Sequence, residues 1–144
     1  MRVKELMTRG VECIEPSTTL QEAARKMREL DVGVLPICTP GGKPIGVLTD
    51  RDIVLRAVAG GEDPMRCPVE NIMTPDLICC HQDQDVHDVA EIMREQQIRR
   101  LLVVNDRGSL IGIVSLGDLA MDTGDCELAG DALAGISEPA MPMP

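Results

Sequence analysis

The sequence contains no aromatic residue: its 144 residues include no Phe, Trp or Tyr. Proteins that bind single-stranded nucleic acid usually stack the bases on aromatic rings, so this absence argues against that class of function. The hydrophobic core must therefore be aliphatic, with nine methionines as adaptable filler. The hydrophobic share of 44% is nevertheless that of a globular protein.

Basic residues are also scarce, with 14 Lys and Arg against 24 Asp and Glu and a net charge of −10. Such a charge repels polyanions and anionic membranes overall, so we expect neither a nucleic acid nor a membrane as partner. The sequence has no apolar run long enough to span a bilayer and no signal-peptide hydrophobic segment at its N-terminus. We therefore expect a cytoplasmic, reducing setting, in which the six cysteines are thiols.

The most informative feature is an internal repeat with an offset of 66 positions. Residues 3–54 align with residues 69–120 without a gap, and thirteen of the aligned pairs are identical. A repeat of this size usually cannot bury its apolar face alone, so the two copies should pack against each other. The cleft between them is the natural place for a ligand. The expected segments are a first repeat, a linker, a second repeat and a partly disordered C-terminal tail, at residues 1–60, 61–68, 69–121 and 122–144.

Hydrophobic periodicity and turn residues predict the same order of elements, β-α-β-β-α, in both repeats, and hence an α/β fold. The strands expected in the first repeat are Val11–Ile14, Val34–Cys38 and Ile45–Leu48, with helices at about 20–30 and 50–58. Those expected in the second are Leu77–Cys80, Leu101–Val104 and Leu110–Val114, with a helix marked by Val86 to Met93 and another at Leu116–Met121. A weak helix is expected over Gly124–Gly135 of the tail.

The third strand of each repeat ends in a hydroxyl residue that is followed three positions later by a carboxylate. The two copies are Thr49 with Asp52 and Ser115 with Asp118. A hydroxyl and the amides at a helix N-terminus favour phosphate, whereas an ionised carboxylate accepts hydrogen bonds from a ribose diol. Together they suit a nucleotide. The alternative is purely structural: the hydroxyls cap the helices, and the carboxylates favour the positive end of the helix dipole.

With this motif, three further pairs of matching segments make the chain resemble a tandem pair of CBS domains, the module named after cystathionine β-synthase. These are Met7-Thr8 and Met73-Thr74, Leu35-Pro36-Ile37 and Leu101-Leu102-Val103, and the glycines Gly46 and Gly112. The resemblance covers about residues 1–121 and is closest to small stand-alone CBS proteins. It implies a CBS pair, or Bateman module, of pseudo-twofold symmetry. It also implies a homodimer and a regulatory adenosyl ligand (AMP, ADP, ATP, NAD or S-adenosylmethionine).

The resemblance also implies roles for individual residues. Thr49 and Ser115 would contact phosphate, and Asp52 and Asp118 would hold the ribose. Adenine would lie in apolar slots made by the segment before the first strand and the start of the second. These slots are Thr8 to Val11 with Val34 to Pro36, and Thr74 to Leu77 with Arg100 to Leu102. Leu102 stands where the first repeat has Pro36, a departure from the family pattern.

The two candidate sites differ in charge. Arg99-Arg100 replaces Gly33-Val34, and Leu116-Gly117 replaces Asp50-Arg51. Arg51, Arg99 and Arg100 are the best phosphate partners, because a guanidinium gives permanently charged, bidentate contacts; each is otherwise an ordinary surface charge. We expect one site to bind better than the other, and the sequence leaves open which.

No arrangement of residues predicts catalysis, since no known motif places His81 or His87 beside a nucleophile. Five residues are of types that bind zinc, but the matching positions of the cysteines favour packing; the five are Cys13, Cys79, Cys80, His81 and His87. The predicted function is a non-enzymatic sensor that binds an adenine-containing molecule, with no obligatory cofactor, and acts on an unknown regulated protein. Two alternatives stay open: a homodimer with vestigial clefts, and a thiol- or zinc-responsive module.

Overall fold

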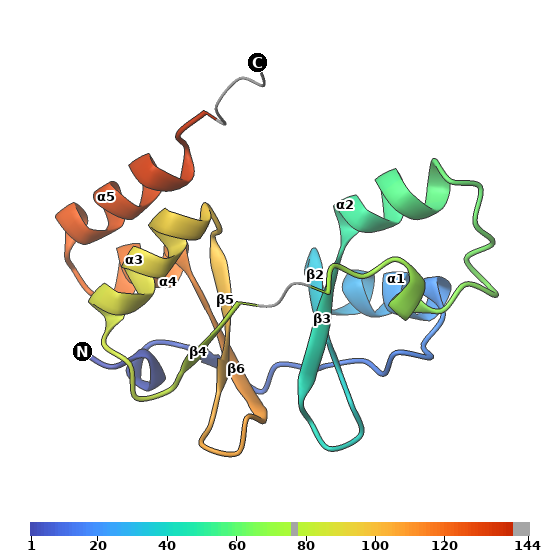
Figure 1. The fold of residues 1–144 in the computed structure, drawn as a ribbon, viewed down its shortest axis with the longest axis horizontal. Coiled ribbons are helices and arrows are strands. Elements are labelled where there is room, and N and C mark those ends of the chain that lie inside the picture. The colour runs from blue at the N-terminus through green and yellow to red at the C-terminus, as the bar shows by residue number, and fades with distance from the viewer. Residues whose placement is uncertain (76–77, 140–144) are drawn as a thin grey trace. The chain divides into compact units, whose positions relative to one another are not determined.

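The structure, a computed structural model, describes residues 1–75 and 78–139 and has the expected α/β fold (Figure 1). The described residues fall into two compact units. Unit one contains residues 1–11, 78–107 and those from 111 onward; unit two contains residues 12–75 and 108–110. Among the described residues, no helix is long and apolar enough to cross a bilayer.

Unit two carries the body of the first repeat. Helix α1 (Leu20–Leu30) begins at Thr19, whose hydroxyl accepts a hydrogen bond from the amide of Glu22 at 3.3 Å. Its apolar residues recur at helical spacing and bury one face. Strands β2 (Val34–Cys38) and β3 (Pro44–Thr49) form an antiparallel hairpin. The chain then enters α2 (Asp50–Asp52), which continues as the π-helical turn η2 (Ile53–Val58).

Unit one carries the body of the second repeat, with the elements in the same order. Strand β4 (Cys79–His81) pairs in parallel with β5 (Arg100–Val104), and helix α3 (Val86–Gln96) lies between them in sequence. Strand β6 (Leu110–Ser115) follows β5 and leads into α4 (Leu116–Asp122). A final helix, α5 (Cys126–Ile136), packs on α3 and α4 (Figure 1).

The segment that precedes each repeat, here called its leader, pairs with the third strand of the other repeat. The first leader runs from η1 (Val3–Glu5) to β1 (Thr8–Arg9), which is antiparallel to β6. The second runs from η3 (Val69–Asn71) to Thr74, which exchanges two backbone hydrogen bonds with Val47 of β3, at 2.9 and 3.1 Å. Each unit therefore combines the body of one repeat with the leader of the other.

The leaders supply part of each hydrophobic core. Val3 of the first leader is fully buried with Leu101, Val103 and Val114 in unit one. Val69 of the second leader is equally buried in the core of unit two, and Ile72 lies beside it. Burying a Val or Leu side chain stabilises a fold by about 1.5–3 kcal/mol, so the leaders are integral to both cores. The expectation of an aliphatic, methionine-containing core is confirmed.

Two expected elements differ from the structure. The predicted strand Val11–Ile14 is wrong: Ile14 alone forms an isolated parallel bridge, to Ile37 of β2. The backbone turns just before it, at Gly10, which has a positive φ of 68°. The matching strand of the second repeat forms at Cys79–His81, and Leu77, its expected first residue, lies outside the described residues. In the tail, α5 is a complete helix up to Ile136, whereas residues 140–144 lie outside the described range.

The leaders approach β3 and β6 so closely that the facing strand positions need glycine. A Cβ added to Gly112 would lie 2.8 Å from both the sulfur of Met7 and the carbonyl oxygen of Thr8. A Cβ added to Gly46 would lie 2.5 Å from the sulfur of Met73 and 3.1 Å from the carbonyl oxygen of Thr74. Only the two backbones, without a side chain between them, fit at these distances.

We expect Gly112→Ala to lower the free energy of unfolding by about 1–3 kcal/mol, because the new methyl group overpacks the strand pair. Gly46→Ala should act in the same direction, and urea unfolding measures both. Gly130→Ala is the matched control: it lies in α5 with nothing within 4 Å of an added Cβ, so alanine should stabilise the helix by about 0.5–1 kcal/mol. Wild-type stability in Gly112→Ala would contradict the tight pairing.

Candidate functional site

The hydroxyl–carboxylate motif forms a reciprocal capping box in both repeats. In unit two, the amide of Asp52 donates to the Thr49 hydroxyl and the amide of Thr49 donates to Asp52 Oδ2, both at 3.0 Å. In unit one, the amide of Asp118 donates to the Ser115 hydroxyl at 3.1 Å, and the amide of Ser115 donates to Asp118 Oδ2 at 2.8 Å. The structural role considered for this motif is therefore present. The capping box uses one oxygen of each carboxylate, Oδ2, as a hydrogen-bond acceptor.

The second oxygen of Asp52 already has partners. Arg56 Nε lies 3.8 Å from Asp52 Oδ1, and the Thr74 hydroxyl lies 3.4–3.5 Å from both carboxylate oxygens. Arg56 also donates to the carbonyl oxygens of Ile72 and Met73 at 3.3 Å, which joins it to the second leader. The Asp52 side chain is only 13% exposed. Arg56 is not among the residues that the sequence motif predicts; its spacing of four residues from Asp52 on a helical segment was the available signal.

Asp118 has a different environment. The position that matches Arg56 holds Asp122, so the cation beside the carboxylate is missing from the second repeat. Within residues 1–75 and 78–139, no cation lies within ion-pairing distance of Asp118. Thr8, the counterpart of Thr74, is exposed on β1. The free oxygen of Asp118 is therefore more available to a ligand than that of Asp52.

Backbone contacts place residues 33 and 99 beside the two caps. The amide of Leu116 donates to the carbonyl oxygen of Arg99 at 2.8 Å, and the amide of Asp50 donates to that of Gly33 at 2.9 Å. The Asp50 carboxylate lies over Gly33, where an added Cβ would be 3.0 Å from Asp50 Oδ2. Arg51, Arg99 and Arg100 are exposed, and none of them forms an ion pair with another described residue.

The remaining predicted site residues divide between packing and surface. Pro36 and Leu102 occupy matching buried positions, so they belong to the hydrophobic interior of their units. Val34 is half-buried at the start of β2, opposite Thr49 across the hairpin. The predicted adenine slots combine Thr8 of unit one with Val34 of unit two, and Thr74 of unit two with Arg100 of unit one. These slots stay a prediction, and the second includes residues 76 and 77, which lie outside the described range.

The duplicated caps and crossed leaders coincide with the two matches of one known family: the CBS domain family matches residues 3–58 and 69–122. The chain belongs to the CBS domain family. Each match begins at the leader and ends in the helical segment that follows the capping box, so the two matches together cover every described helix and strand except α5. The expectation of a tandem CBS pair of small, stand-alone type is confirmed.

Similar proteins agree with this assignment. The CBS domain-containing protein YhcV of Bacillus subtilis is 42% identical over 135 residues, which are 94% of each chain. A CBS domain protein from Pyrobaculum aerophilum, solved in complex with AMP, is 32% identical with a TM-score of 0.78, over 90% of this chain and 99% of that one. Hypoxic Response Protein I, solved with two coordinated zinc ions, is 34% identical with a TM-score of 0.77, over 85% and 98%.

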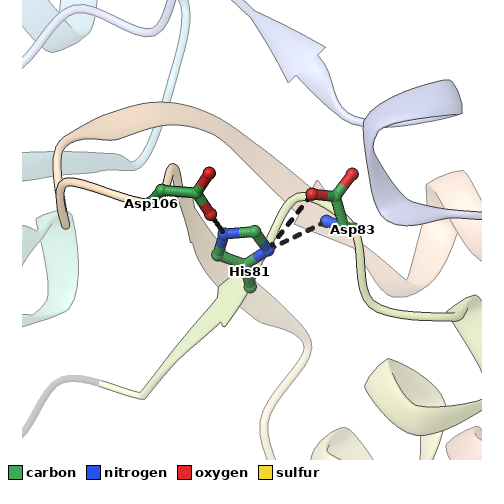
Figure 2. Close-up of side chains that lie close together, drawn as sticks. All are labelled: His81, Asp83 and Asp106. Atoms are coloured by element: carbon green, nitrogen blue, oxygen red, sulfur yellow. Dashed lines mark hydrogen bonds and ion pairs between the residues drawn. The ribbon is translucent and has the colours of Figure 1, made fainter.

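One His/Asp cluster lies elsewhere in unit one, where one ligand-type atom from each of His81, Asp83 and Asp106 lies within 4.8 Å of the others. Figure 2 shows the imidazole between the two carboxylates. Nε2 of His81 lies 2.6 Å from Asp106, whereas Nδ1 accepts the amide of Asp83 at 3.2 Å. A metal ion uses the lone pair of one ring nitrogen, and the carboxylates lie at opposite nitrogens. The arrangement fits a hydrogen-bonded bridge between β4 and the β5–β6 turn.

Asp83 is also bound by cations of the first leader. Lys4 Nζ lies 3.0 Å and Arg2 Nη1 3.5 Å from Asp83 Oδ1. The hydrogen bond from Lys4 is the main reason that the pKa of Asp83 lies below its usual value, and the charges of Lys4, His81 and Arg2 act in the same direction. A metal ion at this cluster would have to compete with Lys4 and Arg2 for the Asp83 carboxylate.

The thiols that suggested a zinc- or redox-responsive module are poorly suited to form thiolates. Burial raises the pKa of Cys80 to about 12, with a smaller contribution from Cys79. Burial also raises the pKa of Cys79, which is half-buried on β4. Since the thiolate is the form that binds metals and reacts, these two residues behave as packing residues. Cys13 and Cys126 are exposed.

We expect iodoacetamide at pH 8 to modify Cys13 and Cys126 of the folded protein rapidly and Cys80 only after unfolding. The reason is that Cys80 is 2% exposed and its raised pKa keeps it protonated. Peptide mass spectrometry over a time course measures each site. Labelling of Cys80 at the rate of Cys13 would contradict the packing role.

We also expect the pKa of Asp83, followed by carboxyl-carbon NMR, to lie below that of an ordinary aspartate and to rise in Lys4→Met. The folded state holds the ionised carboxylate, so the stabilisation is present at neutral pH and is lost as the pH falls through the folded pKa of Asp83. Lys43→Met, in the β2–β3 turn, is the control that should leave this titration unchanged. An unchanged Asp83 titration in Lys4→Met would contradict the assigned cause.

Proposed function

We propose that this protein is a non-catalytic sensor that binds an adenine nucleotide or a related adenosyl ligand and acts on a separate regulated protein. The observation that carries the proposal is the duplicated capping box at the end of the third strand. Each box commits a single carboxylate oxygen, and an ionised carboxylate offers about four acceptor positions. The remaining oxygen is of the right type to accept a ribose hydroxyl; that of Asp52 is shared with Arg56 and Thr74. In unit one, the main chain of Arg99 lies beside the box.

The comparison with solved relatives supports the same ligand class. The P. aerophilum protein was solved in complex with AMP, and 99% of its length aligns with this chain. A bound ligand shifts a protein between two conformations only if it binds one of them more tightly than the other. Ligand binding and the signal to a partner are therefore separate steps. The capping boxes are proposed to carry out the binding step, and the regulated partner the signalling step.

The proposal includes a homodimer. Val54, Leu55 and Val58 on η2 are 56%, 54% and 69% exposed, and Leu30 and Val32 near the end of α1 are also exposed. Apolar side chains on neighbouring elements of one unit are suited to contact a second copy through a symmetric interface. Native mass spectrometry of freshly purified protein reports the assembly size and any retained small molecule together.

We expect millimolar AMP, ADP, ATP, NAD or S-adenosylmethionine to raise the midpoint of thermal unfolding, because a ligand that binds only the folded state stabilises it by about 2.7 kcal/mol at a hundred times its Kd. The double variant Asp52→Asn with Asp118→Asn should lose the shift. Asparagine keeps one acceptor for the capping box and replaces the second carboxylate oxygen with an amide donor. The variant therefore tests the ligand contact with the cap retained.

The same experiment separates the alternatives. A stable dimer with no shift for any nucleotide would contradict the sensor and favour an interaction protein with vestigial clefts. Zinc belongs in the panel because Hypoxic Response Protein I was solved with zinc ions. A zinc shift that is lost in Cys79→Ser, without a nucleotide shift, would favour the metal-responsive alternative.

A further inference from the structure

The two capping boxes are not chemically equivalent. We propose that the box of unit one (Ser115 and Asp118) takes the phosphate-bearing adenine nucleotide, and that the box of unit two (Thr49 and Asp52) disfavours phosphate. This inference rests on the proposed function and specifies which half of the duplicated site has which ligand preference. Three differences between matching residues carry it.

The first difference is the charge beside the caps. In unit two, positions 33, 34, 50 and 51 are Gly, Val, Asp and Arg, which sum to zero charge. In unit one, the matching positions 99, 100, 116 and 117 are Arg, Arg, Leu and Gly, which sum to +2. The backbone contact between Arg99 and Leu116, at 2.8 Å, places the main chain of Arg99 beside the cap. Two guanidinium groups favour a phosphate through charge-assisted hydrogen bonds.

The second difference is that the acidic side chain beside the first cap, Asp50, is replaced by Leu116 beside the second. Arg99 and Arg100 are both exposed, yet neither forms an ion pair within residues 1–75 and 78–139. In unit two the carboxylate of Asp50 occupies the space over Gly33, where it would repel a phosphate.

The third difference is the state of the ribose-type carboxylate. Asp52 is 13% exposed and is bound by Arg56 at 3.8 Å and by the Thr74 hydroxyl at 3.4 Å. A ligand at this box must displace or share these partners. Asp118 has no such cation, because Asp122 replaces Arg56. The box of unit one therefore combines an available carboxylate with available guanidinium groups, which suits a ribose phosphate.

Titration calorimetry with AMP and with adenosine tests this inference. We expect wild-type protein to bind one AMP per chain, more tightly than adenosine, with an affinity for AMP that falls as salt rises. The double variant Arg99→Gln with Arg100→Gln should weaken AMP about tenfold or more and bring it to the level of adenosine, whose own affinity should change little. Arg99→Gly with Arg100→Val, which installs the residues of the first repeat, should act alike.

The control is Arg28→Gln with Arg107→Gln, which removes the same charge from exposed positions on α1 and the β5–β6 turn and should leave both affinities unchanged. Asp118→Asn should weaken AMP more than Asp52→Asn does. Thermal unfolding checks that each variant is folded. If Arg99→Gly with Arg100→Val does not fold, the test relies on Arg99→Gln with Arg100→Gln.

The outcomes separate this inference from the proposed function. Unchanged AMP affinity in both arginine variants would overturn it, as would a stronger effect of Asp52→Asn than of Asp118→Asn. Wild-type protein that binds adenosine as tightly as AMP would overturn the phosphate preference and leave the adenosyl sensor intact. Wild-type protein that binds neither would overturn both.

Discussion

The exchange of leaders between the repeats is the constraint on which the rest of the structure depends. Strand β6 obtains its outer partner from β1 of the first leader, and β3 obtains backbone partners from Thr74 of the second. Backbone donors and acceptors in a sheet need partners, and the matching glycines Gly46 and Gly112 allow the approach. Because Val3 and Val69 are fully buried in the cores that they join, neither repeat completes its own core. Duplication is therefore a structural requirement of this fold.

The same exchange connects the fold with the candidate site. Thr74 lies directly after the second leader's buried segment and reaches Asp52, so the leader and the capping box share one hydrogen-bonding network. A reciprocal box typically contributes about 1 kcal/mol to helix stability. It also fixes the carboxylate in one orientation before any ligand arrives, which reduces the entropy lost on binding. The structural and the functional interpretations of the motif are thus compatible, because they use different oxygens of the same side chain.

Local signals in the sequence predicted much of this fold, and the errors lie where non-local contacts decide. The spacing of Leu20, Ala23 and Met27 predicted α1, and two apolar runs around a Gly-rich turn predicted the β2–β3 hairpin. The crossing of the leaders was not predicted, since nothing in a leader's own sequence indicates its partner strand. For the same reason the strand predicted at Val11–Ile14 is wrong, since only Ile14 pairs, in a single bridge to Ile37.

Helix α5 and the candidate site show two further limits. Helix α5 was expected to be weak because the apolar pattern fades in this part of the sequence. It packs through small residues, Ala132 and Gly135, the latter lying against the Arg94 side chain. Small residues produce little apolar periodicity, although they allow close approach. At the site, the sequence supplied the hydroxyls, carboxylates and arginines. It did not supply the ion pair between Arg56 and Asp52, which depends on how η2 continues after the capping box.

The distribution of identical and divergent pairs follows from these constraints. Identical pairs such as Val3 and Val69, Met7 and Met73, and Leu35 and Leu101 lie in the leaders and cores, where a change of volume is costly. The divergent pairs that change charge, Gly33 with Arg99 and Arg56 with Asp122, lie at exposed positions around the caps. A surface substitution there leaves folding nearly unaffected but changes the potential that a small anion meets. A duplicated scaffold can therefore keep two equal frames and acquire two unequal sites, since the residues that hold the frame are not those that set the charge at its edge.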